Sequence, residues 1–306
     1  MLFCLQEIIK NIEQHVGQLG GKSEFSQHHM VIKPDGSIPD MTHYQGLGFV
    51  TSFDFIPLTQ IQLDIIGSIE STTFVKLNDY SFEMIYKNTD QSKTGRNIQM
   101  FNVIINDEAH IVINVHYHYN DSVNKFNNDI IEQLIDKLSP SFVMGDFNSN
   151  PVFKRYYDVL KGLKTFPTDI NATDLLDHIF VRENIKWQFE LCRKFDIKEV
   201  TGDALDKINQ ELVGKNNSYL KKKKLLENSY LVGVNDEFYS DHIVYIFKVI
   251  TLNNTQFLMG TINILAPHTS TAHMLHPMMG RRVKDIGRIK ELVDQINNIK
   301  LDTDKK

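Results

Sequence analysis

Short apolar runs bounded by polar or turn-forming residues constrain the fold of this chain more than any other feature of its sequence. Their length suits buried β-strands, which they predict at residues 112–115, 142–144, 243–250 and 257–265. The polar linker between the last two runs suits a hairpin. Apolar residues recur at helical spacing over 130–138 and 286–299. Because helices and strands alternate, we expect an α/β protein in which helices cover sheets.

The N-terminal residues fit two structures. Apolar residues at helical spacing, from Leu2 to Leu19, suit one helix that starts almost at Met1. The alternative is a short buried strand over 2–5 that turns at Gln6 and Glu7 into a helix. Helix and strand propensities alone do not decide between the two.

The composition excludes several classes of protein. The chain has 306 residues, of which 42% are hydrophobic and 23% charged, as in ordinary soluble globular proteins. Its two cysteines cannot form a disulfide framework or a cysteine-rich zinc site, so any metal should bind oxygen or imidazole ligands. The formal net charge of −5 argues against non-specific binding of nucleic acid over the whole surface, but it leaves room for a local basic groove.

The sequence shows neither a membrane span nor a linker that would divide the chain into domains. No apolar stretch reaches the roughly 20 residues of a membrane span, and the first residues lack the basic region of a signal peptide, so we expect a cytoplasmic protein. No linker rich in Pro, Gly or Ser is present, which predicts one domain over 1–306. A lysine-rich insertion is predicted at about 187–232. Its lysines suit either a contact with RNA or lipid phosphates or a solvated helix face.

Four polar clusters each begin or end a predicted strand, which is where an α/β sheet presents ligands. In the first, GDFNSNP at 145–151, Asp146 and Asn148 lie two residues apart after a strand. Such an acid and amide could activate water and hold a phosphate oxygen, although a Gly/Asn/Pro turn explains the same residues. In the second, Asp241 and His242 precede a strand and suit either contact with phosphate or a solvated turn.

The third cluster ends the strand at 112–115. Alternation along a strand puts Asn114, His116 and His118 on one face. Two imidazoles at this spacing could bind zinc, but no third ligand is evident nearby, and a half-buried polar strand end is the alternative. In the fourth cluster Asp177 enters an apolar run, and taken alone it suits a structural aspartate.

Taken together, the order and spacing of these clusters resemble the motifs of the endonuclease/exonuclease/phosphatase superfamily. The chain has GDFNSNP at 145–151, LDHIFV at 176–181 and SDH at 240–242, in the order of the family. NVH at 114–116 matches the Asn-Thr-His strand of the family. The resemblance covers nearly the whole chain, except for 187–232, where members usually have a much shorter connection.

Two further motifs of the family stand at opposite ends of the chain. Members begin with a strand that carries an Asn, followed by a strand that ends in Leu-Gln-Glu. Here Leu5-Gln6-Glu7 opens the chain, whereas TINILAP, with Asn263, lies at 261–267. Reading the end of the chain onto its beginning restores the usual order. The resemblance therefore predicts a circularly permuted member with a strand and then a helix at the N-terminus. The alternative is that 261–267 is an unrelated strand.

The resemblance implies a four-layer sandwich, in which two central β-sheets are flanked by helices, and metal-dependent hydrolysis of a phosphate ester. The expected cofactor is Mg²⁺, or Mn²⁺ in its place, bound through oxygen ligands and water. The implied metal ligands are Glu7, Asn263 and Asp241. We also expect the substrate to contact Arg281, Arg282 and His118.

The same resemblance implies catalytic roles. Asp146 would position or deprotonate the attacking water, and Asn148 would fix that water and the phosphate. His242, oriented by Asp177, would contact the phosphoryl oxygens together with His116. Preplaced donors of this kind are needed because charge develops on the phosphoryl group during the reaction.

The details of the motifs bear on the substrate. GDFNSNP and the residues after it, the LQE strand and NILAP are most similar to the deadenylase branch of the superfamily, which shortens poly(A) tails. We therefore expect a nuclease acting on single-stranded nucleic acid, a deadenylase-like 3′ exonuclease of RNA. A phosphatase acting on a phosphoinositide or a small phosphorylated molecule is an alternative enzyme. A catalytically inactive binding module is an alternative of another class.

Overall fold

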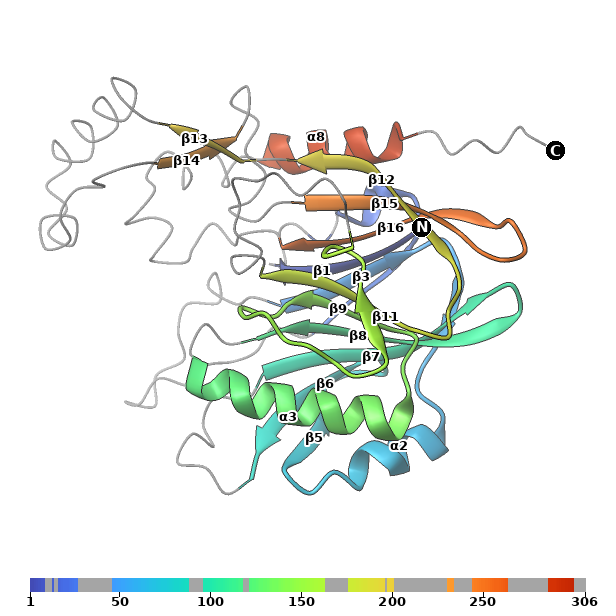
Figure 1. Ribbon diagram of the computed structural model, residues 1–306, viewed down its shortest axis with the longest axis vertical. Coiled ribbons are helices and arrows are strands. Elements are labelled where there is room, and N and C mark those ends of the chain that lie inside the picture. Colours follow the sequence, from blue (N-terminus) through green and yellow to red (C-terminus); the bar gives the residue numbers. More distant parts are fainter. Residues whose placement is uncertain are drawn as a thin grey trace, which may run out of the picture.

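Two β-sheets lie one above the other at the centre of the molecule (Figure 1). The structure is a computed structural model. It describes residues 1–8, 13, 16–26, 46–87, 96–117, 121–162, 176–195, 197–200, 230–233, 244–263 and 286–299, and at some of these, including Glu7, it describes the backbone alone.

The first sheet has six strands in the order β12-β15-β16-β1-β3-β2. Its centre is formed by β16 and β1, which come from opposite ends of the chain and run parallel. The other neighbouring strands of this sheet are antiparallel. The bounds are β1 Leu2–Ile8, β2 Lys22–Phe25, β3 Gly46–Thr51, β12 Gln188–Phe195, β15 Val244–Ile250 and β16 Gln256–Asn263.

The second sheet has the order β10-β11-β9-β8-β7-β6-β5, with β4 paired to β7. Only β8 and β9 are parallel among these pairs, and helix α3 (Asp121–Leu138) connects them as a crossover helix. The bounds are β4 Asp54–Ile56, β5 Thr72–Lys76, β6 Ser81–Tyr86, β7 Arg96–Ile105, β8 Glu108–His116, β9 Phe142–Asp146, β10 Tyr156–Asp158 and β11 Asp177–Arg182. A separate two-stranded ribbon is formed by β13 Ile197–Val200 and β14 Tyr230–Gly233.

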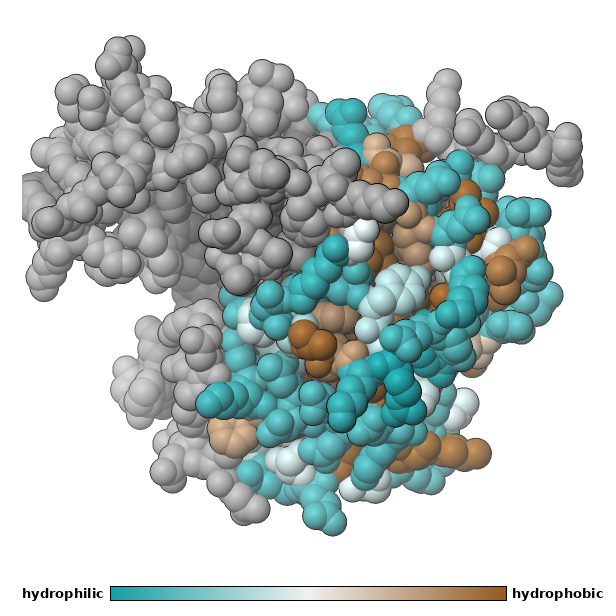
Figure 2. All heavy atoms as spheres, in the orientation of Figure 1, coloured by the Kyte–Doolittle hydropathy of each residue, from teal (hydrophilic) through white to brown (hydrophobic). Residues whose placement is uncertain are grey.

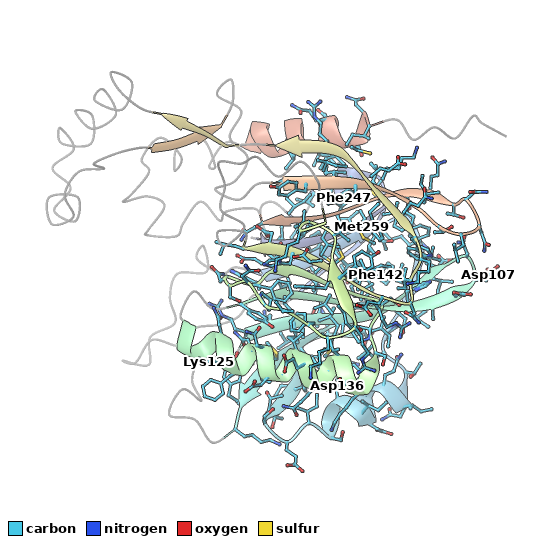
Figure 3. The ribbon with its side chains drawn as sticks, in the orientation of Figure 1. Asp107, Lys125, Asp136, Phe142, Phe247 and Met259 are labelled. Carbon is cyan, nitrogen blue, oxygen red and sulfur yellow. The ribbon has the colours of Figure 1, made fainter. Side chains whose placement is uncertain are left out.

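Helices cover the outer faces of both sheets, which gives four layers. Helices α2 (Gln60–Gly67) and α3 pack on the second sheet, and α8 (Ile286–Asn297) and the short helix η1 (Gly17–Leu19) pack on the first. Between the sheets lies a separate buried cluster that includes Phe142, Phe247 and Met259 (Figure 3). The predicted fold class, two central sheets flanked by helices, is confirmed.

Strand alternation explains how one short strand serves two layers. In β1, Leu2 and Cys4 point into the cluster between the sheets, whereas Phe3 and Leu5 point toward α8. All four side chains are fully buried. A strand with apolar residues on both faces reads as a continuous apolar run, and this is why the periodicity of the N-terminus is ambiguous.

The N-terminus is a strand and not a helix from Met1, and this strand continues through Gln6 and Glu7 to Ile8 instead of turning at residues 6 and 7. The predicted hairpin joins β15 to β16, with Thr251 and Thr255 bonded across the turn. The predicted strands at 112–115 and 142–144 lie within β8 and β9.

The segment predicted as an insertion, 187–232, begins with a strand of the sandwich. Residues 188–195 form β12, the edge strand that pairs with β15. The residues 197–200 and 230–233 form the separate ribbon. The lysines that characterise this segment, Lys215 and Lys221, Lys222, Lys223 and Lys224, lie outside the described residues.

Hydrophilic side chains cover most of the described surface on the face shown in Figure 2, and hydrophobic ones form small groups between them. Among the described helices, none is both long and apolar enough to span a membrane.

Candidate active site

Polar residues from both sheets meet where four central strands end. Asp146 and His116 close the parallel strands β9 and β8, and Asn263 closes β16. Glu7 lies next to last in β1, directly after Gln6, which pairs with Asn263. The carboxyl ends of parallel strands are where sheets of this kind present ligands, and we take this edge as the candidate active site.

Gly145 allows β9 to approach β8 closely just before Asp146. Its φ angle is +136°, in the region that favours glycine. A methyl group built on it would lie 2.0 Å from the carbonyl oxygen of Val115. No other residue fits here. The glycine of the GDFN turn therefore sets the backbone position of Asp146, which follows it.

The Asp146 carboxylate is almost fully buried, with 1% of the residue exposed, and donors surround it. Its Oδ2 accepts hydrogen bonds from the Nδ2 atoms of Asn263 at 2.8 Å and Asn148 at 3.2 Å. Its Oδ1 accepts one from the backbone N–H of Asn148 at 2.7 Å. The Nε2 atom of His116 lies 3.6 Å from Oδ2. These donors compensate the cost of burying a carboxylate, which is large without them.

Asn148 holds the turn through both its backbone and its side chain. Its φ angle is +44°, a left-handed conformation that Asn tolerates better than most residues. Its Nδ2 also donates to the carbonyl oxygen of Tyr117, at 3.1 Å. The amide therefore ties Asp146 to the end of β8. The expected contact of this amide with a phosphate stays a prediction.

Tyr117 is a buried neighbour that stays neutral. Burial is the main cause that raises its pKa well above the usual value, and the nearby Tyr86 raises it further. Its ring packs edge-on against Phe147, with 4.9 Å between the ring centres. Tyr117 therefore contributes its backbone carbonyl and its ring to the site, and it is no general base near pH 7.

Asp177 lies beside Asp146 on the neighbouring strand. It is the first residue of β11, pairs with Asp146 in the sheet register, and is 4% exposed. The backbone N–H of Phe147 donates to the carbonyl oxygen of Leu176 at 2.8 Å, which ties the turn to this strand. Asp177 is predicted to orient His242, which lies outside the described residues.

Asn263 links the two sheets. It is predicted to support Glu7 as a metal ligand, and in the structure its Nδ2 donates to Asp146 on the opposite sheet. The side chain of Glu7 is not described. The predicted site residues Asp241, His242, His118, Arg281 and Arg282 lie outside the described residues. The strand that follows 241–242, β15, begins near this edge, because Tyr245 pairs with Thr261.

A buried polar network lies directly beneath the site, and sequence reasoning missed most of it. Gln6 donates from Nε2 to the Oδ1 of Asn114 at 2.8 Å and accepts from the hydroxyl of Thr261 at 3.0 Å. Asn114 donates to the Gln99 side chain and the Gly48 carbonyl, both at 2.9 Å. Gln6, Asn114 and Gln99 are all fully buried. The signal was available, because each interrupts an apolar run.

This network ties β1 of the first sheet, and so the backbone at Glu7, to β8 of the second sheet. Its polar atoms are satisfied by one another, which fixes how β1 packs against β8. Asn114 shares the strand face of His116, as alternation predicts, but it points into the interior of the sandwich and contacts no ligand site.

The donor set suits a hard divalent cation. Around the edge stand the carboxylate of Asp146, the amide of Asn263 and the position of Glu7, which offer oxygen and no sulfur. Mg²⁺ and Mn²⁺ prefer such ligands. Among the residues whose side chains are described, no group of three or more His, Cys, Asp or Glu side chains could hold a metal ion. The side chains of the predicted ligands Glu7 and Asp241 are not among those described.

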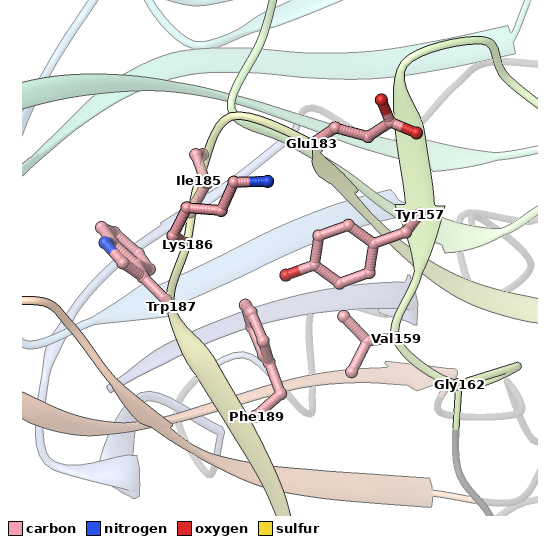
Figure 4. Close-up of a pocket in the computed structure, with 8 residues that line it drawn as sticks. All are labelled: Tyr157, Val159, Gly162, Glu183, Ile185, Lys186, Trp187 and Phe189. Carbon is pink, nitrogen blue, oxygen red and sulfur yellow. The ribbon is translucent and has the colours of Figure 1, made fainter.

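A cavity of about 670 Å³ lies elsewhere, between β10 and the first residues of β12 (Figure 4). Tyr157, Trp187 and Phe189 line it, with Glu183 and Lys186. It opens beside the residues that follow β11, whereas Asp177 begins that strand, so it is distinct from the site. None of the predicted site residues whose side chains are described lines it, whereas buried polar groups converge at Asp146.

Comparisons with known proteins complete the description. No protein-family model matches the sequence, and no curated protein matches it. Solved structures that match include truncated TDP2 of Caenorhabditis elegans, with 14% identity over 62% of this chain and 74% of that chain and a TM-score of 0.36. The human Nocturnin catalytic domain matches with 15% identity over 64% of this chain and 73% of that chain, with a TM-score of 0.38.

A third match is a protein from Bacteroides thetaiotaomicron, with 14% identity over 65% of this chain and 74% of that chain and a TM-score of 0.36. It is described as an endonuclease/exonuclease/phosphatase family protein, the superfamily that the sequence motifs resemble. We base the function of this chain on its own site residues.

Proposed function

We propose that this chain is a divalent-metal-dependent phosphoester hydrolase of the endonuclease/exonuclease/phosphatase superfamily. The observation that carries the proposal is the buried Asp146 carboxylate, held by Asn148 and Asn263 with His116 at 3.6 Å, at the edge where both sheets end. A buried carboxylate fixed by amides beside an imidazole is suited to holding the attacking water in place next to a phosphate.

Each residue at this edge receives a role. Asp146 positions the attacking water or takes its proton. The water oxygen forms a bond to phosphorus as the ester P–O bond breaks, and the leaving oxygen takes up a proton from solvent and departs as an alcohol. His116 donates to a phosphoryl oxygen, and Asn148 and Asn263 keep the carboxylate in place. His242, oriented by Asp177, gives a second donor. Such donors act most strongly when they are fixed before the reaction.

The metal belongs on the side of β1 and β16. We assign Glu7, Asn263 and Asp241 to Mg²⁺, with Mn²⁺ as the alternative ion. When bound, the cation supplies positive charge that stabilises the phosphoryl group in the transition state. The buried network of Gln6 and Asn114 supports the assignment of Glu7, because it holds the strand that carries this residue.

For the substrate we propose single-stranded RNA, cleaved from its 3′ end in the manner of a deadenylase. The support is the sequence of the turn and of the LQE and NILAP segments, which are most similar to that branch. Arg281, Arg282 and His118 are proposed to contact the strand, and the lysines within 187–232 are candidates for further phosphate contacts. One catalytic domain spans 1–306, with a lysine-rich insertion at about 187–232, in a cytoplasmic protein.

We further propose that the chain is circularly permuted. The parallel strands β16 and β1 are neighbours, and α8, which follows β16, packs on their sheet. That is the geometry of a strand–helix–strand crossover. The start of β1 and the end of α8 both lie near Gly20. A methyl group built on Gly20 would be 3.8 Å from Cε of Met1 and 4.0 Å from Oδ1 of Asn297. The missing link would join α8 to β1.

The first test is product analysis of a 5′-labelled RNA with a 3′ oligo(A) tail, incubated with Mg²⁺. We expect a ladder that shortens from the 3′ end and is lost in EDTA. Glu7→Gln should lower the rate by about 100-fold or more, because it removes a charged ligand. Its melting temperature in metal-free buffer should stay within about 3 °C of the wild type.

Other outcomes separate the alternatives. RNA that stays intact, together with Mg²⁺-dependent phosphate release from an inositol phosphate, would favour the phosphatase. Binding of RNA with no cleavage of either substrate, unchanged in Glu7→Gln, would contradict a hydrolase and favour the binding module.

A further inference from the structure

A second buried polar cluster lies behind the turn that carries Asp146 and Asn148. It consists of Asp158 at the end of β10, Lys161 just after it, and His178, the second residue of β11. His178 is fully buried and Asp158 nearly so. The sequence motif LDHIFV gave a role to Asp177 and none to His178, and the proposed mechanism uses none of these three residues.

His178 connects Asp158 to the backbone of the turn. Its Nδ1 lies 2.7 Å from Oδ2 of Asp158, and its Nε2 lies 3.0 Å from the carbonyl oxygen of Ser149. A carboxylate and a carbonyl oxygen only accept hydrogen bonds, so each ring nitrogen has to donate. Only a side chain with two opposed donors can make both contacts.

Aromatic rings fix the plane of this imidazole. Phe180 stacks on it with 5.3 Å between ring centres and an interplanar angle of 23°. Phe147, itself part of the turn, packs edge-on at 5.5 Å. The ring therefore cannot swing away from Ser149 without displacing both neighbours.

Lys161 makes a parallel connection from the same carboxylate. Its Nζ lies 3.8 Å from Oδ2 of Asp158 and 3.5 Å from the carbonyl oxygen of Pro151. The backbone N–H of Leu160 donates to Oδ1 of Asp158 at 3.0 Å, which anchors the carboxylate in β10's own turn. One buried carboxylate thus holds two donors, and each donor holds a carbonyl of the 147–151 turn.

We propose that Asp158, His178 and Lys161 are positioning residues that set the conformation of the 147–151 turn and, through it, the orientation of the Asp146 carboxylate. Asn148 supplies two of the donors to Asp146 from this turn. A shift of the turn moves both donors together. The catalytic consequence rests on the proposed hydrolase function, whereas the effect on the turn does not.

The test compares His178→Gln with His110→Gln. His110 is also a buried histidine of the same sheet, with Nδ1 3.1 Å from the Ser141 hydroxyl, but it lies at the other end of β8 from His116. Hydrogen exchange of peptides covering 147–152 is followed by mass spectrometry at pH 7.5. Because glutamine cannot donate in two opposed directions, His178→Gln should speed exchange there about tenfold or more, and His110→Gln should not.

Activity supplies the second measurement, with bis(4-nitrophenyl) phosphate and Mg²⁺ as the probe. His178→Gln should lower kcat by about 10- to 100-fold, as loss of an outer partner of a site does, with KM within about threefold. His110→Gln should leave both near the wild-type values. Lys161→Met removes the amine but keeps the partly exposed aliphatic part of the side chain, and it should lower kcat by about 2- to 10-fold. This variant tests the proposal if His178→Gln does not fold.

Three outcomes would overturn the proposal. One is unchanged exchange of the turn in His178→Gln, or in Lys161→Met where His178→Gln does not fold. Another is equal loss of kcat in His178→Gln and His110→Gln, which would indicate a general loss of stability. The third is a KM effect alone. A wild type that hydrolyses no phosphoester would contradict the proposed function, and the exchange measurement would still decide whether the cluster positions the turn.

Discussion

At the scale of the residue, buried polar groups gather at the ends of the central strands and in the interior beneath them. Asp146 is held by amide donors from two sheets, and Asn114, one strand away, is held by the network of Gln6 and Gln99. The two sets of contacts differ in what they leave available. Asn114 lies in the interior of the sandwich, whereas Asp146 is the last residue of β9, at the edge where the central strands end.

Loss of Asn114 tests how much the network stabilises the sandwich. Asn114→Ala leaves the side chains of Gln6 and Gln99 and the Gly48 carbonyl without this partner in the interior. We expect the free energy of unfolding, measured by urea titration, to fall by about 3 kcal/mol. The control is Thr261→Val, which removes one bond at the edge of the network and should cost about 1 kcal/mol. Equal costs for the two would contradict a central role for Asn114.

Some of these polar residues could be predicted from the sequence. Asp146, Asn148 and Asp177 belong to the motifs GDFNSNP and LDHIFV, and the structure brings all three to the edge where the central strands end. Gln6 and Asn114 stand out only as polar letters in apolar runs, which does not tell whether they face each other. His178 reads as an ordinary strand residue, because nothing local shows that Asp158, 20 positions earlier, is its partner.

At the scale of the element, the parallel pair β8–β9 sets the geometry of the site. Helix α3 returns the chain from the end of β8 to the start of β9, so His116 and Asp146 finish side by side. The pair can close only because Gly145 has no side chain to meet the carbonyl of Val115. The glycine is therefore as much a part of the site as the acid that follows it.

Gly145→Ala should open this pair. The added methyl group would meet the Val115 oxygen at 2.0 Å, and the φ angle of +136° is strained for alanine. We expect a loss of about 3 kcal/mol or more in the free energy of unfolding, measured by chemical denaturation. Gly162→Ala is the matched control, because its nearest contact would be an ordinary 3.5 Å, and it should cost less than about 1 kcal/mol. A smaller loss of unfolding free energy for Gly145→Ala than for Gly162→Ala would contradict this role of Gly145.

Elements differ in how far the sequence predicts them. The hairpin of β15 and β16 follows from two apolar runs and a polar linker, all local features. Strand β12, QFELCRKF, lies within the segment 187–232 that is predicted as an insertion, because members of the family usually have a much shorter connection there. Pairing with β15 supplies the hydrogen bonds that make it a strand.

At the scale of the whole molecule, each sheet is built around one parallel pair with a helix packed on it. In the second sheet α3 links β8 to β9 directly. In the first sheet β16 leads into the segment that contains α8, while β1 begins the chain. The strand β16, near the end of the chain, is thus structural, because it lies in the middle of its sheet between β15 and β1.

Deletion of residues 251–306 should therefore abolish cooperative unfolding. It removes β16 and α8, exposes the edge of β1 and uncovers the buried cluster of Phe3, Leu5 and Ile246. The loss is read from a thermal melt followed by circular dichroism. The control is a relinked chain in which Lys306 is joined to Met1 and the 251–255 turn is opened, since it keeps every element. A cooperative melt of the deleted chain, or failure of the relinked one, would contradict the permutation.

The sequence by itself determined the local features: apolar runs that must be buried, a helix with one apolar face in α3, a glycine where a strand turns, and acids and amides at strand ends. These depend on spacing along the chain, which hydrophobic burial and backbone sterics translate directly into elements. Only the tertiary structure decided which strands are neighbours. The bond from Asn263 to Asp146 and the contact of His178 with Asp158 join distant parts of the chain, and their cause is the register of packed sheets, which no local pattern specifies.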